Sequence, residues 1–402
     1  MHEVALTELH TLVLALVALL LGQALADRIA LLRKLNVPVP VVGGVLAALA
    51  LSALRAFAGI EVTVATSFRD LQLLVFFTTI GLSAKLSSLR AGGVQLIIVC
   101  AATVLLLVLQ NLVGVGLALA RGGHPFYGLL LGSISFVGGP GTALAWAKEG
   151  EAMGLRYAPE IALGTATLAV VTGALVAGPI TGWLIERRKL HAAAAPSAIS
   201  FVPATSEREP ANASSMEQVM RTMLLIAVAV GIGQRLNEWA VQANLLLPGF
   251  LTAMLGGVLI SNLSDLFGKK LDMRPIENGG EWALQLFLVM SLMSLKLWTL
   301  AVAAGPLLLN VVLQIAVTTL VAVGILFRLL GRDYEAAVTC GGFLGFGLSS
   351  MPVALATMDQ VSARYGPAPR AFLLITLAGS FFVDLANAFV TKAFLALPIF
   401  GR

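Results

Sequence analysis

Residues 76–86 read Phe76-Phe77-Thr78-Thr79-Ile80-Gly81-Leu82-Ser83-Ala84-Lys85-Leu86, and a related stretch returns later as Phe287-Leu288-Val289-Met290-Ser291-Leu292-Met293-Ser294-Leu295-Lys296-Leu297. At the same offset Ala143-Leu144-Ala145 aligns with Ala354-Leu355-Ala356, and nearby Arg156-Tyr157-Ala158-Pro159 resembles Arg364-Tyr365-Gly366-Pro367. The chain is therefore predicted to consist of two related halves. Internal repeats in an apolar chain are typical of secondary transporters, whose ligands bind between the halves.

The composition excludes an ordinary soluble domain. Of the 402 residues, 58% are hydrophobic and 12% are charged, whereas about a quarter of the residues in soluble proteins are charged. Cys100 and Cys340 lie in apolar or glycine-rich segments and are interpreted as packing residues. The basic residues behind the net charge of +5 lie at the ends of apolar segments. That placement is typical of topology signals and gives no reason to expect nucleic-acid binding.

Apolar runs long enough to cross a bilayer recur along the whole chain. Ten spans are predicted, five in each half, at about 10–32, 37–57, 68–86, 94–120, 158–186, 217–238, 246–262, 279–297, 304–328 and 368–398. Two further stretches, about 125–148 and 336–358, are apolar but interrupted by glycine and proline. These are predicted to be re-entrant hairpins or unwound helices, because irregular backbone at membrane depth must be buried in protein or line a wet cavity.

The halves are predicted to be residues 1–189 and 216–402, joined by a solvated linker rich in Ala, Ser and Pro at 190–215. Most of the 26 lysines and arginines fall on one side if both termini are periplasmic and the linker is cytoplasmic. Because five spans is an odd number, the second half then enters the membrane upside down. The expected fold class is an all-α polytopic membrane protein with two inverted-topology repeats, each carrying one hairpin.

The two interrupted stretches are the predicted substrate site. The first contains Ser133-Ile134-Ser135-Phe136-Val137-Gly138-Gly139-Pro140-Gly141-Thr142, and the second contains Gly341 to Pro352. A helix that restarts after such a break points its N–H groups and positive dipole end at the break, which suits an anion. Close helix packing through small residues is the alternative for either stretch alone. The predicted substrate-binding residues are Ser135, Gly138, Gly139, Gly141, Thr142, Gly345, Gly347, Ser349 and Ser350.

A third candidate lies in the last predicted span. Asp384 stands near its middle, where an ionisable side chain is costly and rarely idle. Asn387 follows at i+3 on the same helix face. With Thr165 in the matching helix of the first half, these residues are predicted to bind Na⁺ or a substrate ammonium group. A structural partner for Asp384, or a proton carried on it, remains an alternative.

The mid-helix amides are predicted to form hydrogen bonds between helices. They are Gln110, Asn111, Asn310 and Gln314. Neither glycine-rich stretch contains arginine or lysine, so the positive field there is expected to come from backbone N–H groups and hydroxyls. With one mid-membrane acid, the arrangement suits a dicarboxylic amino acid, or a plain dicarboxylate carried with Na⁺. No phosphate-binding loop, nucleophile–base pair or stack of charged rings is visible, so neither an enzyme nor a channel is expected.

Five motifs together resemble one family. They are Val39-Pro40-Val41-Val42-Gly43-Gly44, Phe76 to Leu82, Gly138-Gly139-Pro140-Gly141-Thr142, Cys340 to Leu348, and Phe381-Phe382-Val383-Asp384-Leu385-Ala386-Asn387-Ala388. In this order and spacing they resemble the bacterial sodium/glutamate symporter family over nearly the whole chain. The resemblance implies sodium-driven uptake of L-glutamate across the bacterial inner membrane, a homodimer, and a fold similar to the sodium/citrate carriers, which work as elevators. A sodium- or proton-coupled carrier of aspartate, citrate or malate is the alternative.

Overall fold

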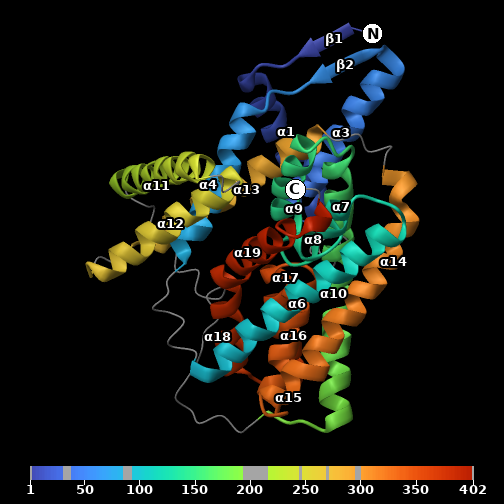
Figure 1. Cartoon of the computed structure of the whole chain (residues 1–402), viewed down its shortest axis with the longest axis vertical. Coiled ribbons are helices and arrows are strands. Elements are labelled where there is room, and N and C mark those ends of the chain that lie inside the picture. Colours follow the sequence, from blue (N-terminus) through green and yellow to red (C-terminus); the bar gives the residue numbers. More distant parts are fainter. Residues whose placement is uncertain are drawn as a thin grey trace.

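The computed structural model describes residues 2–29, 38–84, 93–192, 216–243, 247–268, 271–294 and 300–400, and helices dominate it (Figure 1). Most of the predicted linker lies outside the described residues, as do the matched lysines Lys85 and Lys296.

The first half begins with a short strand and continues as helices. Its elements are β1 (His2–Ala5), α1 (Glu8–Arg28), α3 (Val39–Ala58), β2 (Ile60–Thr63), α4 (Ser67–Ser83), α6 (Gly93–Ala120), α7 (Pro125–Leu130), α8 (Ser133–Phe136), α9 (Gly139–Ala152) and α10 (Ala158–Arg188). The strands pair in parallel, with His2 opposite Ile60. The sequence does not predict this small sheet.

The second half is helical within the described residues. Its elements are α11 (Met216–Gln242), α12 (Gly249–Leu266), α13 (Met273–Met293), α14 (Leu300–Thr319), a π-helical segment (Leu320–Leu326), α15 (Phe327–Leu329), α16 (Tyr334–Leu348), α17 (Met351–Tyr365), α18 (Pro369–Leu377), a second π-helical segment (Ala378–Phe382), α19 (Val383–Leu395) and a 3₁₀ turn (Pro398–Phe400). The π-helical segments widen the backbone of two otherwise continuous helices.

Seven helices in the described part of the chain are long and apolar enough to cross a membrane. They are α1, α3, α6, α10, α11, α12 and Leu307–Leu329, which runs from α14 into α15. The three other predicted spans coincide with α4, α13 and the helix at 369–395. Those three stay predictions as spans, because α4 has only 17 residues, α13 carries several charges, and the last helix is interrupted by π-helical turns. The structure thus supports a multi-pass membrane protein.

The helices divide into two bundles. The first bundle comprises α1, α3, α4, α11, α12 and α13, and the hairpin bundle comprises α6 to α10 and α14 to α19. Figure 1 shows the first bundle beside the strands and the hairpin bundle beyond it. Contacts across the seam come mainly from α9 against α13 and from α4 against the π-helical segment at 378–382. Each bundle therefore contains helices from both halves of the chain.

Small residues allow the helices of the first bundle to touch through their backbones. A Cβ placed on Gly81 of α4 would lie 2.0 Å from the Met254 carbonyl oxygen of α12, and one on Gly257 would lie 2.4 Å from the Thr78 carbonyl oxygen. Any larger residue would push the helices apart, since such distances are far inside van der Waals contact. Backbone approach of this kind is a common way to pack helices in membranes, where lipid tails weaken the hydrophobic driving force.

Both glycine-rich stretches interrupt their helices, and both are buried. The first broken segment, residues 125–152, consists of α7, α8 and α9 with breaks at 131–132 and 137–138. The second broken segment, residues 334–365, consists of α16 and α17, which pack together and are separated by Ser349 and Ser350. Neither stretch is a continuous helix facing lipid.

Candidate functional site

The breaks in the two segments meet beside the middle of α10. Gly139 begins α9 with φ +66°, a left-handed conformation that glycine adopts without strain. A Cβ on Gly139 would lie 3.6 Å from the Ser349 carbonyl oxygen, and a Cβ on Gly173 would lie 2.7 Å from the Ser349 Cβ. Two helix N-termini, those of α9 and α17, therefore start close to one point. Their free N–H groups and dipoles make this point attractive to anions.

The outer ends of the two segments lie far from each other, at opposite ends of α10. A Cβ on Gly150 in α9 would lie 3.2 Å from the Cβ of Ala158, the first residue of α10. At the other end, Arg364 and Tyr365 of α17 bind Glu186 at 3.1 and 2.6 Å. A helix the length of α10 spans about 46 Å. The two segments thus approach the meeting point from opposite ends of the hairpin bundle.

Buried amides hold the carbonyl groups that the breaks leave free. Asn310 Nδ2 and Gln314 Nε2 donate to the Leu131 carbonyl oxygen at 2.7 and 3.3 Å. Gln110 Nε2 donates to the Gly347 carbonyl oxygen at 2.7 Å. All three side chains are fully buried. The predicted bonds between helices are confirmed, since Gln110 also donates to Thr318 of α14 and Gln314 donates to the Gln110 carbonyl oxygen of α6. The sequence did not predict that the same amides also reach the broken backbone.

Asn387 ties the last helix to the first broken segment. The Ser133 hydroxyl donates to Asn387 Oδ1 at 2.7 Å, and Asn387 Nδ2 donates to the Ser133 carbonyl oxygen at 3.1 Å. Asn111 Oδ1 accepts from the Ser133 N–H at 2.9 Å. Asn387 therefore lies directly against the first broken segment.

Four predicted hydroxyl residues are buried, namely Ser135, Thr142, Thr165 and Ser349, and two of them donate to backbone carbonyl groups. The Ser135 hydroxyl donates to the carbonyl oxygens of Leu130 and Ala162, and Thr165 donates to the Ile161 carbonyl oxygen at 2.7 Å. Thr142 is buried in the first turn of α9 against Gly138. Each hydroxyl oxygen keeps lone pairs that can accept or coordinate.

The predicted glycines are sites of close packing around the breaks. A Cβ on Gly138 would collide with the Ile134 carbonyl oxygen and with Thr142, and one on Gly345 would lie 2.4 Å from the Ala354 Cα. Gly347 packs against Leu106 and Thr318. Gly141 differs, because a Cβ there would meet Leu284 of α13 across the seam between bundles. Gly141 is therefore placed where the two bundles touch.

Asp384 and Ser350 complete the predicted set. Ser350 is the N-cap residue of α17, and Asp384 lies in the first turn of α19, half-buried and one turn before Asn387. The described residues provide no hydrogen bond or ion pair to the Asp384 carboxylate. Carboxylate, amide and carbonyl oxygens are suitable ligands for a hard cation such as Na⁺. The described residues contain no cluster of three His, Cys, Asp or Glu side chains for a transition metal.

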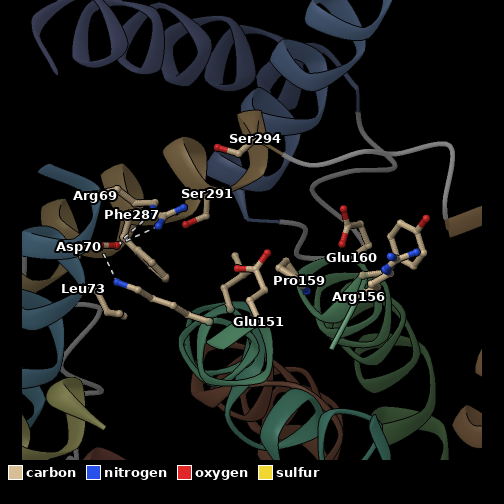
Figure 2. A pocket seen from close by; sticks show the side chains of 13 residues that line it. Arg69, Asp70, Leu73, Glu151, Arg156, Pro159, Glu160, Phe287, Ser291 and Ser294 are labelled. Atoms are coloured by element: carbon tan, nitrogen blue, oxygen red, sulfur yellow. Dashed lines mark hydrogen bonds and ion pairs between the residues drawn. The ribbon is translucent and has the colours of Figure 1, made fainter. Parts of the chain in front are cut away.

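A charged cavity of about 440 Å³ lies at the seam, near the outer end of the first broken segment. Asp70 of α4, labelled with Arg69 in Figure 2, binds both Lys148 of α9 and Arg69. The Lys148 Nζ–Asp70 Oδ2 distance is 2.5 Å, and the Arg69 Nη2–Asp70 Oδ1 distance is 3.0 Å. Glu151 and Arg156 also line the cavity. The sequence does not predict these residues as part of a site, because the predicted substrate site lies in the glycine-rich stretches. The residues lie near helix ends or in the repeated Arg-Tyr motif.

Helices long enough to span a membrane, with two buried breaks meeting among them, define a multi-pass membrane transporter. Residues 4–367 match the sodium/glutamate symporter family. The sodium/glutamate symporter of Escherichia coli K12 is 39% identical over 402 residues, covering 98% of this chain and 99% of that protein. The sodium/glutamate symporter of Haemophilus influenzae is 36% identical over 391 residues, covering 96% and 97%.

The chain belongs to the sodium/glutamate symporter family. This confirms the resemblance drawn from the five motifs, together with the expected sodium-coupled glutamate symport and the expectation that the protein is a transporter and no enzyme.

Proposed function

We propose that this protein carries L-glutamate with Na⁺ across the bacterial inner membrane by moving the hairpin bundle against the first bundle. The observation that carries the proposal is the meeting of Gly139 and Ser349 beside Gly173. Two helix N-termini converge there within one bundle, so a bound anion would travel with that bundle as a unit. The narrow seam to the first bundle supports an elevator motion, since few contacts must be broken for the hairpin bundle to slide.

The proposed architecture is two inverted repeats, residues 1–189 and 216–402, with periplasmic termini and the linker at 190–215 in the cytoplasm. The opposite approach of the two broken segments along α10 supports this arrangement. So does the equal contribution of the two halves to each bundle: α1, α3 and α4 pack with α11, α12 and α13. We further propose a homodimer in which the first bundle forms the stationary interface.

In the proposed site, glutamate carboxylates bind the N–H groups and hydroxyls at the starts of α9 and α17. The contributing residues are Ser135, Gly138, Gly139, Gly141, Thr142, Gly345, Gly347, Ser349 and Ser350. Na⁺, the coupling substrate, binds oxygens near Asp384 and Asn387, with Thr165 contributing from α10. Asn387 supports a direct link between the two ligands, because its amide is bonded to Ser133 of the first broken segment.

Coupling follows from linkage. Na⁺ binding neutralises Asp384 and orders the backbone around Ser133, which raises glutamate affinity. Glutamate must then raise Na⁺ affinity by the same factor. Each net positive charge that moves inward gains about 2.3 kcal/mol per 100 mV of membrane potential. Because glutamate carries a net charge of −1, the potential drives uptake only when more than one cation accompanies it.

Counterflow in proteoliposomes tests this function. Vesicles preloaded with unlabelled glutamate, aspartate, citrate or malate are diluted into labelled glutamate, with Na⁺ or with choline. We expect exchange that saturates, requires Na⁺ and is strongest with glutamate. The Asp384→Asn variant should lose sodium-dependent uptake, whereas Asp27→Asn, which changes an exposed carboxylate on α1, should keep it. Full uptake by Asp384→Asn would remove Asp384 from the site, and exchange of citrate or a proton requirement would favour the alternative carrier.

A further inference from the structure

The repeated Arg-Tyr motif lines two cavities at opposite ends of α10. The α9–α10 cavity, of about 440 Å³, includes Arg156 and Tyr157 with Glu160 from the start of α10. The α10–α17 cavity, of about 540 Å³, includes Arg364 and Tyr365 with Glu186 from the end of α10. Matching residues of the two halves thus line one cavity at each end of α10.

Arg156 is available for a ligand in the α9–α10 cavity. The other cations there, Arg69 and Lys148, are both bound to Asp70. Among the described residues no carboxylate forms an ion pair with Arg156, and its side chain is exposed. Figure 2 shows Arg156 and Glu160 together at one side of the cavity, with Glu151 between them and Asp70. An exposed arginine with the Glu151 carboxylate in the same cavity matches an acidic amino acid, which carries two carboxylates and one ammonium group.

Arg364 already holds a carboxylate in the α10–α17 cavity. Its Nη2 lies 3.1 Å from Glu186 Oε1, and its guanidinium group stacks over the Tyr365 ring at 5.0 Å. The Tyr365 hydroxyl donates to the same Glu186 oxygen at 2.6 Å. A guanidinium group has five N–H donors, and the Arg364 side chain is 72% exposed, so donors remain for a second carboxylate. The ring holds the guanidinium plane in place for it.

We propose that Arg156 and Arg364 form two carboxylate-binding vestibules, one at each face of the membrane, which hold glutamate weakly before it enters and after it leaves the central site. This inference rests on the proposed glutamate transport. Arginine suits the role because its planar fork matches a carboxylate, and an exposed contact is weak enough to release the ligand. Binding here needs no Na⁺, because the proposed Na⁺ ligands lie at the central site.

Cysteine protection tests the vestibules separately from transport. In full-length protein with Cys100 and Cys340 replaced by alanine, one variant carries Ser294→Cys in the α9–α10 cavity and another carries Gln360→Cys in the α10–α17 cavity. The rate of labelling by a charged thiol reagent is measured in detergent, without Na⁺, with and without glutamate at constant ionic strength. Glutamate is titrated, and labelling at both positions should slow by about threefold once its concentration reaches about twice the dissociation constant of the vestibule. Glutamine, which lacks the side-chain carboxylate, should protect less.

Variants of the two arginines then show which arginine is responsible for the protection at each cysteine. Arg156→Gln should remove protection at position 294 and leave it at 360, Arg364→Gln should do the reverse, and lysine at either position should restore part of it. Arg235→Gln, at an exposed ion pair within α11, is the matched control and should change neither. The proposal would be overturned if protection survived Arg156→Gln and Arg364→Gln, or if either substitution reduced protection equally at both positions. Protection that requires Na⁺ would also overturn it. Counterflow by the parent protein, run in parallel, separates this failure from a failure of the proposed transport.

Discussion

Asn387 and Ser133 stand 254 positions apart and hold each other through two hydrogen bonds, one in each direction. Both side chains are fully buried, so each would leave polar atoms of the other unpaired if it were removed. The pair joins the helix that carries Asp384 to the segment that begins the proposed substrate site. It is a direct physical connection between the proposed cation site and the proposed anion site.

A double-mutant cycle measures the strength of this pair. Ser133→Ala, Asn387→Leu and the double variant are compared by thermal unfolding in detergent. Each single change should destabilise the protein by about 1–3 kcal/mol, because a buried partner is left unsatisfied. The double variant should lose less than the sum of the two. Ser52→Ala, which removes a hydroxyl bonded only within its own helix, is the control; strictly additive losses would contradict a direct bond.

The buried amides should matter more than exposed ones. Gln314→Leu removes the N–H donors to the carbonyl groups of Leu131 and Gln110, and the Gln314 side chain is fully buried. We expect a loss of about 1–3 kcal/mol. Gln285→Leu removes an exposed amide on α13 that bonds only to Glu281, and it should change stability by less than about 0.5 kcal/mol. Equal melting temperatures for the two variants would argue against the assigned role of Gln314.

The Lys148–Asp70 ion pair links the two bundles in the described arrangement. An elevator motion must break it, so Asp70→Asn should lower the population of this arrangement. The pair is partly exposed and worth at most about 1 kcal/mol, which corresponds to a shift of about fivefold. Single-molecule distances between dyes on α3 and α16 measure the population. Glu238→Gln breaks a pair within α11 alone and should leave the distribution unchanged; if Asp70→Asn does so too, the pair does not link moving parts.

A pH series tests Glu335 at the first turn of α16. Burial raises the pKa of its carboxyl, against the Ala371 N–H and the Arg370 charge, which lower it. A carboxyl group whose pKa is raised by folding lowers the free energy of unfolding once the pH exceeds that pKa. It has no such effect below its unfolded pKa of about 4.5. Glu335→Gln keeps an acceptor for Ala371 and should therefore raise the melting temperature at pH 7.5 but not at pH 4. A gain of the same size at both pH values would contradict this assignment.

The sequence predicts much of this fold because its signals are local. Glycine and proline predict the breaks near Gly139 and Ser349, and apolar runs predict the long helices. Asp384 is noticed because it is an acid near the middle of an apolar segment. The partner of each polar side chain is a different matter. The sequence predicts that Gln110 and Asn310 bond between helices but not which carbonyl groups they reach. Helical periodicity gives the face on which a residue lies and not the backbone opposite it.

The charged cavity shows the same limit. The sequence does not predict that Lys148, Asp70 and Arg156 line one cavity, because only tertiary structure brings α4, α9 and α10 together. The sequence does not predict the small parallel sheet either. Its two strands have only four residues each, and α1 and α3 lie between them in the chain. The sequence shows that the two Arg-Tyr pairs correspond to each other. Only the structure shows that each pair lines a cavity.

Glutamate binding to the purified protein, measured by calorimetry with NaCl replaced stepwise by choline chloride at constant ionic strength, tests the central claim most directly. If Na⁺ and glutamate are held together through Asp384, Asn387 and the meeting helix ends, the dissociation constant for glutamate should fall by about tenfold or more as Na⁺ rises, within the usual range of linked sites. A dissociation constant that is the same with and without Na⁺ would contradict the account.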